Sequence, residues 1–145
     1  MKLLIQRVSR ADVSVNNEIV GKINRGLLVF LGVVKGDTTA QADYLANKLV
    51  NLRIFEDENE KMNLSVQDIH GSILLTSQFT LAADTSRGNR PGFDNAEIPD
   101  KAKQMYEYFI QQLKIKGITP QTGIFQADMK VSLINDGPAS FLLEK

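Results

Sequence analysis

The polar side chains best suited to chemistry gather in two short segments of the chain. Ser77-Gln78-Phe79-Thr80 places two hydroxyls and an amide at the end of a stretch that is otherwise apolar. Residues 135–140 (NDGPAS) combine an amide, a carboxylate and a Gly-Pro pair. Each segment also has a plainer interpretation, because the first fits a strand end that faces solvent and the second an ordinary turn. Taken by themselves, the residue types leave both interpretations open.

The composition excludes several other kinds of site. With no cysteine, the chain has no disulfide framework, no thiolate nucleophile and no Cys-based metal site. Its single histidine, His70, precedes a glycine in DIHGS and fits a turn residue better than a member of a catalytic triad. The acidic run at 56–60 fits a solvated loop, and no GxSxG or GxGxxG motif is present. We therefore expect no metal and no cofactor.

Length and charge indicate an ordinary globular chain. Its 145 residues, 43% hydrophobic and 23% charged, predict a single domain over residues 1–145. Seventeen basic and seventeen acidic residues argue against nucleic-acid binding through the total charge, although a local basic patch remains possible. The longest apolar run is Gly26–Val34, too short to span a membrane, and the N-terminus does not fit a signal peptide. We expect a cytoplasmic protein without membrane association.

The elements that must position the two segments follow from hydrophobic periodicity. Thr38 and Gln41 form a predicted capping box at the start of the first helix, and Asn16-Asn17 is the predicted turn of a hairpin. The predicted strands are 3–8, the two arms of a hairpin over 13–23, 26–34, 72–79 and 129–134, and the predicted helices cover 42–50 and 99–117, with a loop at 84–94. Strands outnumber helices and do not alternate with them regularly. This predicts an α+β fold, a mostly antiparallel β-sheet or partial barrel with two helices.

Read as a whole, the chain resembles the D-aminoacyl-tRNA deacylase family from end to end. SQFTL (77–81) and NDGPAS (135–140) match the family's two signature segments, SQxxL and NxGPxT. The segments QRVSRADVSV, GLLVFLGV, LRIFEDENEKMNLS and RPGF are also similar to that family. One departure is Ser140, which stands where the family has Thr and so keeps the hydroxyl but lacks a methyl group.

The resemblance implies an activity, a partner and an assembly. The family hydrolyses the ester of D-aminoacyl-tRNA, and also glycine misattached to tRNA, and rejects L-aminoacyl-tRNA. The partner is the 3′ end of aminoacyl-tRNA, and the active site lies near the interface of a homodimer. The peptide bond carried over to Gly137-Pro138 is cis, and its carbonyls reach into the partner's pocket as a backbone filter.

Carried over residue by residue, the resemblance gives a candidate site. The catalytic candidates are Ser77, Gln78, Phe79 and Thr80. The candidates for substrate binding and chiral selection are Met129, Asn135, Gly137, Pro138 and Ser140. Arg87 and Arg90 are candidate tRNA contacts.

Two mechanisms and two other functions remain open at this stage. Backbone N–H groups near Phe79 and Thr80 can stabilise an oxyanion while the 2′-hydroxyl of the terminal ribose helps to activate water. In the competing mechanism Thr80 is a covalent nucleophile, although no base to activate it is evident in the sequence. The other functions are a hydrolase of free esters or peptides, and a non-catalytic RNA-binding module that uses Arg87, Arg90, Lys101 and Lys103.

Overall fold

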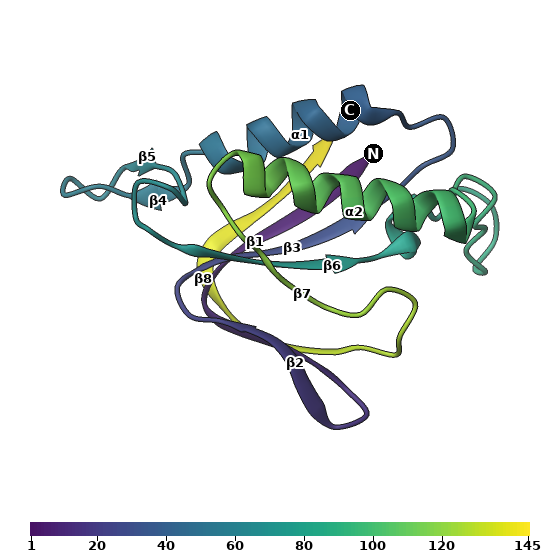
Figure 1. Cartoon of the computed structure of the whole chain (residues 1–145), viewed down its shortest axis with the longest axis horizontal. Helices are drawn as coiled ribbons and strands as arrows, with labels where there is room; N and C mark the ends of the chain where they lie inside the picture. The colour runs from purple at the N-terminus through teal and green to yellow at the C-terminus, as the bar shows by residue number, and fades with distance from the viewer.

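The computed structural model describes residues 1–145 as a twisted six-stranded sheet with both helices on one face, as Figure 1 shows. Strand order is β2-β1-β3-β6-β7, and β8 pairs with β1 along nearly its whole length, from Lys2 to Ser14. The elements are β1 (Lys2–Val15), β2 (Glu18–Ile23), β3 (Gly26–Gly32), α1 (Thr39–Asn51), β4 (Phe55–Glu56), β5 (Met62–Leu64), β6 (Ser72–Ser77), the 3₁₀ helix η1 (Phe79–Ala82), α2 (Pro99–Ile115), β7 (Gln121–Thr122) and β8 (Lys130–Glu144). The predicted α+β class with two helices is confirmed.

β1 is the organising strand, because β2, β3 and β8 all pair with it in antiparallel orientation. The parallel pairs are β3 with β6 and β6 with β7. Parallel neighbours need a long crossover, and α1 and α2 lie in those two connections. The sheet is therefore mostly antiparallel, as expected.

The main hydrophobic core lies between the sheet and the two helices. Alternate residues of a strand face opposite sides, so Ile73 and Leu75 of β6 join this core while Leu74 belongs to a second, smaller core. The main core includes Leu3, Ile5, Leu27, Val29, Leu31, Leu45, Leu49, Phe109 and Leu113. β3 is buried along both faces, which explains its unbroken apolar sequence. Neither helix combines the length and apolar character needed to cross a membrane.

Several local signals in the sequence are confirmed by the backbone. Thr38 Oγ1 accepts a hydrogen bond from the N–H of Ala40, and the Gln41 side chain accepts one from the N–H of Thr38, which completes the capping box. Asn16 and Asn17 have φ of 52° and 66°, as a tight hairpin between β1 and β2 requires.

Several predicted boundaries are wrong, as for the strand predicted over 3–8, which extends as β1 to Val15, and two of the errors fall at the candidate site. The strand predicted over 72–79 ends at Ser77, because the chain turns into η1. The strand predicted over 129–134 continues as β8 to Glu144, so residues 135–138 do not end it. The β1–β8 register shifts twice between Gln6 and Arg10, and the NDGP segment is accommodated as an irregular bulge within one long strand.

Candidate active site

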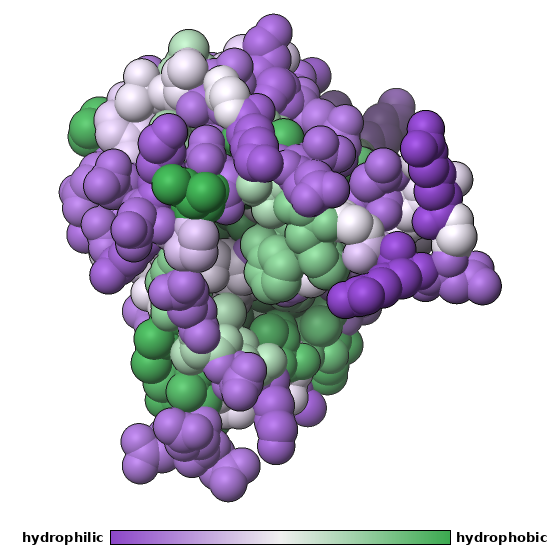
Figure 2. Space-filling model, turned by 90° about the vertical axis from the view of Figure 1, so that its right-hand side faces the viewer, coloured by the Kyte–Doolittle hydropathy of each residue, from purple (hydrophilic) through white to green (hydrophobic).

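A cavity of about 700 Å³ opens where β3 and β6 end beneath the first turn of α2. Its walls are Leu31 and Val33, Ser77 to Phe79, then Phe93, Ala96 and Glu97, then Pro99, Ala102 and Tyr106 of α2, and residues 125–130 ahead of and entering β8. Most of these residues are apolar. Figure 2, which views the right-hand side of Figure 1, shows apolar side chains gathered in the middle of that face beside hydrophilic ones. The volume and lining suit an organic ligand held by a few polar groups.

The first candidate segment forms one wall of this cavity. The N–H of Gln78 donates to the carbonyl of Leu31 at 2.8 Å, so the segment stays attached to β3 after β6 has ended. Ser77, Gln78 and Phe79 line the cavity, whereas Thr80 does not. The Gln78 amide donates to Thr80 Oγ1, and no carboxylate, histidine or amine bonds that hydroxyl. The structure thus brings three of the four catalytic candidates to the cavity and leaves Thr80 beside it.

Gly32 is a residue that the sequence analysis missed at this wall. A Cβ placed on Gly32 would lie 2.9 Å from Cβ of Leu81 and 3.0 Å from the carbonyl oxygen of Gln78. Only glycine lets η1 approach the end of β3 so closely. The available signal was a glycine that interrupts the apolar run GLLVFLGVV.

Tyr106 of α2 lines the cavity and also binds the strand that leads into this wall, β6. Its hydroxyl donates to the carbonyl of Leu75 at 2.9 Å, and the same carbonyl accepts a hydrogen bond from the N–H of Gly123. Burial raises the pKa of Tyr106 well above its usual value of 10.0, so the hydroxyl stays a donor over the neutral range. Its ring packs 5.9 Å from that of Phe125, between centroids. The sequence places Tyr106 within the helix predicted over 99–117, but helical periodicity does not reveal this hydrogen bond.

Two exposed aromatic rings and three charged side chains border the cavity. The ring centroids of Phe79 and Phe93 are 5.1 Å apart, so residues from two separate loops form one aromatic edge. The charged groups are Glu97, Asp128 and Lys130. Oε1 of Glu97 accepts a hydrogen bond from the N–H of Ile98 at the start of α2. Met129, a candidate for substrate binding, also lines the cavity.

The second candidate segment lies outside this cavity. Asn135, Gly137, Pro138 and Ser140 are all exposed residues of β8, and none of them lines the cavity of their own chain. The Gly137-Pro138 peptide bond is cis, as the resemblance implied. A single chain therefore does not bring the two candidate segments together.

Side chains from β1 and from the segment itself hold this exposed bulge. Asn135 Nδ2 lies 3.4 Å from the carbonyls of both Arg7 and Ala139. Ser140 Oγ accepts a hydrogen bond from the Gln6 amide at 3.2 Å. The polar side chains of Asn135 and Ser140 thus contact β1 and the bulge itself, while Gly137 stays exposed.

Arg7 is a second residue that the sequence analysis missed. It is only 3% exposed, and its Nη1 donates to the carbonyl of Ile54 at 2.6 Å. Its Nε donates to the carbonyl of Asp136, directly ahead of Gly137. The signal was an arginine inside the apolar strand at residues 3–8, where a buried charge must have partners.

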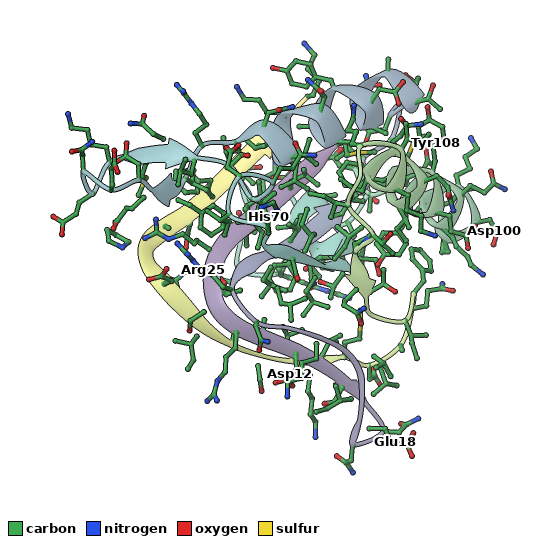
Figure 3. All side chains as sticks on the ribbon, turned by 60° about the vertical axis from the view of Figure 1, so that its left-hand side comes forward. Asp12, Glu18, Arg25, His70, Asp100 and Tyr108 are labelled. Carbon is green, nitrogen blue, oxygen red and sulfur yellow. The ribbon has the colours of Figure 1, made fainter.

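The remaining candidates lie away from the cavity walls. Arg87 and Arg90 are exposed in a loop closed by two backbone hydrogen bonds between Asp84 and Gly92. His70 has φ of 50° and lies in the turn before β6, as Figure 3 shows, which agrees with its interpretation as a turn residue. The structure contains no group of three or more His, Cys, Asp or Glu side chains arranged to hold a metal ion.

Comparison with known proteins identifies the family of this chain. The family model described as D-Tyr-tRNA(Tyr) deacylase matches residues 4–144. A D-aminoacyl-tRNA deacylase of Geotalea uraniireducens (strain Rf4) is 60% identical over 144 residues, covering 99% of this chain and 93% of the relative. One of Pelobacter propionicus is 53% identical and covers 100% of both chains.

Two solved structures share the fold. The protein named c-Myc DNA Unwinding Element Binding Protein has a TM-score of 0.94 at 40% identity, covering 100% of this chain and 99% of its own. A structure described as a probable eukaryotic D-amino acid tRNA deacylase has a TM-score of 0.81 at 16% identity, covering 98% and 97%. Because the family model spans nearly the whole sequence and curated relatives match it end to end, the chain belongs to the D-Tyr-tRNA(Tyr) deacylase family.

Proposed function

We propose that this chain hydrolyses the ester bond of D-aminoacyl-tRNA and of glycyl-tRNA, and rejects L-aminoacyl-tRNA through the backbone at Gly137 and Pro138. Family membership carries the deacylase activity and the hydrolase class. The supporting structural observation is the cavity of about 700 Å³ with Ser77, Gln78 and Phe79 on its wall. A cavity of that size accommodates an amino acid joined to adenosine. We assign the whole of residues 1–145 to one catalytic domain.

The reaction needs positioning more than a strong nucleophile, because an aminoacyl ester is already reactive. In this proposal backbone N–H groups at the Phe79–Thr80 turn stabilise the oxyanion, and the 2′-hydroxyl of the terminal ribose helps to activate water. Two observations favour this route over covalent catalysis by Thr80. Its hydroxyl lies outside the cavity lining, and its one hydrogen-bond partner is the Gln78 amide, which is not a base.

The chiral filter requires a second copy of the chain in this proposal. Gly137 and Pro138 are exposed and do not reach the cavity of their own chain, so they act in the cavity of a partner. Exposed apolar residues on the same strand, Ile134 at 47% and Leu142 at 56%, supply surface for a closed homodimer. The carbonyls of Gly137 and Pro138 exclude an L side chain and leave room for a D side chain. Glycine places no side chain there and passes the filter.

The other candidate residues have supporting roles in the same proposal. Asn135 and Ser140 position the bulge, since their side chains bind Arg7, Ala139 and Gln6. Met129 contacts substrate within the cavity. Arg87 and Arg90, exposed on the 84–92 loop, contact the tRNA backbone. The enzyme acts in the cytoplasm, where charged tRNA is used.

Side-by-side deacylation of D-Tyr-tRNA, L-Tyr-tRNA and glycyl-tRNA tests this proposal, with the ethyl ester of D-tyrosine as a fourth substrate. We expect hydrolysis of the first and third only. Comparable activity on the ethyl ester would indicate a general ester hydrolase, and tRNA binding without hydrolysis would indicate a binding module. Hydrolysis of L-Tyr-tRNA at a rate similar to that of D-Tyr-tRNA would refute the proposed chiral filter but not the proposed deacylase activity.

A further inference from the structure

A second, smaller recess adjoins the active-site cavity. It has a volume of about 240 Å³, and none of the side chains that line it is hydrophobic. Ser14, Asn16 and Asn17 come from the β1–β2 hairpin, and Asp128 and Lys130 from the start of β8. Asp128 and Lys130 also line the main cavity, so the two spaces share a wall. Figure 1 shows the β1–β2 hairpin and the connector into β8 at the same end of the sheet.

Lys130 is the only cation that lines either space. It is exposed, lies opposite Ser14 in the β1–β8 register, and has no carboxylate within 4.0 Å of its ammonium group. The nearest acidic groups in sequence and register are Asp128, which lines both spaces together with Lys130, and Asp12, which lies two residues from Ser14 and pairs with Ser132. Figure 3 places Glu18 at the outer end of the hairpin. Lys130 thus offers an unpaired positive charge beside two neutral amides and a hydroxyl.

We propose that this polar recess binds the ribose and phosphodiester of the nucleotide that precedes the terminal adenosine. The inference rests on the proposed function, which places the aminoacyl-adenosine in the main cavity. The rest of the tRNA must then leave the main cavity across one of its edges. The recess begins at the edge that Asp128 and Lys130 form, because these two residues line both spaces. Lys130 and the amides of Asn16 and Asn17 donate to phosphate oxygens, and Asp128 accepts from a ribose hydroxyl.

The chemistry of the recess favours this ligand over others that could enter from the same cavity. An apolar amino-acid side chain gains nothing in a space without hydrophobic walls. The single negative charge of a phosphodiester pairs with the one cation, Lys130, and its oxygens accept hydrogen bonds from the neutral amides. The hydroxyl of the adjacent ribose donates to the one carboxylate, Asp128. The contact is independent of sequence, which suits a substrate whose 3′ end is shared by all tRNAs.

Two small substrates isolate the contact: adenosine carrying a D-tyrosyl ester, and the dinucleotide cytidylyl-adenosine carrying the same ester. We expect the wild-type enzyme to hydrolyse the dinucleotide with kcat/KM about tenfold higher than adenosine, as a charge-assisted contact provides. In Lys130→Gln the ratio of kcat/KM for the dinucleotide ester to that for the adenosine ester should fall to near one. In Lys130→Arg, which keeps the charge, the ratio should persist. The plot of log KM for D-Tyr-tRNA against log salt becomes shallower by about 0.7 in Lys130→Gln, the value for one phosphate on a single strand.

Lys22→Gln is the matched control, because Lys22 is an exposed lysine on β2 that lines neither space. It should keep both the preference and the salt slope. A wild-type enzyme without preference for the dinucleotide, or a Lys130→Gln enzyme that retains it, would overturn the proposal. If the wild-type enzyme hydrolysed neither of the two small esters nor D-Tyr-tRNA, the result would instead count against the proposed function.

Discussion

Nε of Arg7 donates a hydrogen bond to the carbonyl oxygen of Asp136 across 2.8 Å, and joins the first strand to the residue ahead of Gly137. The same buried guanidinium donates to Ile54 and lies 3.4 Å from the Asp136 carboxylate. One side chain from β1 therefore fixes the bulge of β8 against the segment that follows α1. The first prediction follows from this contact.

Arg7→Met should lower the free energy of unfolding by about 2–4 kcal/mol, because it leaves the buried carbonyl of Ile54 and the part-buried carbonyl of Asp136 without their donor. Deacylation of D-Tyr-tRNA should fall as well, since the bulge loses its anchor. Urea denaturation and initial rates provide the two measurements. Arg10→Met, at an exposed position on the same strand, is the control and should change either value little. Equal effects of the two substitutions would contradict the anchoring role.

Gly32→Ala should displace η1 and reduce kcat on D-Tyr-tRNA by roughly 10–100-fold, the usual effect of a small misplacement in an active site. The added methyl group meets Cβ of Leu81 and the carbonyl of Gln78, neither of which can rotate away. Gly92→Ala serves as the control, because a Cβ there meets only the Asp84 carbonyl, at 3.8 Å. Steady-state kinetics after circular dichroism would decide, and a Gly32→Ala enzyme with normal kcat would show that η1 tolerates the shift.

Thr80→Ala should retain activity within roughly tenfold of wild type, whereas removing a covalent nucleophile costs on the order of 10⁶-fold in kcat. The reason is that Thr80 has no base beside it and does not line the cavity. The measurement is single-turnover hydrolysis of D-Tyr-tRNA. A complementary substrate with a 2′-deoxy terminal ribose should react much more slowly. A large loss in the folded variant, together with normal hydrolysis of the deoxy substrate, would reverse the mechanistic assignment.

Tyr106→Phe should cost about 1 kcal/mol of stability at neutral pH, because the Leu75 carbonyl keeps its bond from Gly123. The folded pKa of Tyr106 lies above its unfolded value of 10.0, so the stability from this tyrosine is full below pH 10 and is lost as the pH rises further. Denaturation midpoints from pH 8 upward would therefore fall more steeply above pH 10 in wild type than in Tyr106→Phe. Parallel pH profiles for the two proteins would show that the hydroxyl is not held in its neutral form.

Gly137→Ala should impair hydrolysis of D-Tyr-tRNA without creating activity on L-Tyr-tRNA. A Cβ at 137 would lie 2.6 Å from Oδ1 of Asn135, whose side chain is already held by Arg7 and Ala139. The Asn135 side chain or the bulge must then shift, and in the proposed filter the methyl group narrows a space that already excludes L side chains. Glycyl-tRNA should be affected less, because it carries no side chain toward the new methyl. A folded variant that gained L-Tyr-tRNA hydrolysis, or whose rates on all three substrates were unchanged, would refute the assigned position of Gly137.

The sequence predicted the elements well where one local cause decides the structure. The capping box at Thr38 and the Asn16-Asn17 turn depend on neighbouring residues alone, and both are confirmed. The two boundaries predicted wrongly at the candidate site, the end of β6 and the end of β8, depend on distant contacts. Ser77 ends β6 because Gly32, on another strand, admits η1, and β8 continues past residue 138 because β1 and Arg7 receive the bulge. No window of sequence around 77 or 137 contains those partners.

The candidate site was predicted in part, for a similar reason. Ser77, Gln78 and Phe79 came from the matched segment SQFTL, and Met129 was a further candidate for substrate binding; all four line the cavity. Glu97, Tyr106 and Lys130 line it as well, but no motif in the sequence marks any of them as a site residue. Their role depends on which residues the fold brings opposite them, and the periodicity of one element does not carry that information.

β8 begins at the wall of one cavity with Lys130 and carries Gly137 and Pro138 on its exposed middle part. In the proposed dimer each strand therefore serves its own subunit at one end and the neighbouring subunit at the other. In genetic terms, an allele that spoils the cavity and an allele that spoils the bulge can complement each other. A heterodimer of the two mutant chains contains one intact site, formed by the normal cavity of one chain and the normal bulge of the other. A homodimer of either mutant chain contains none.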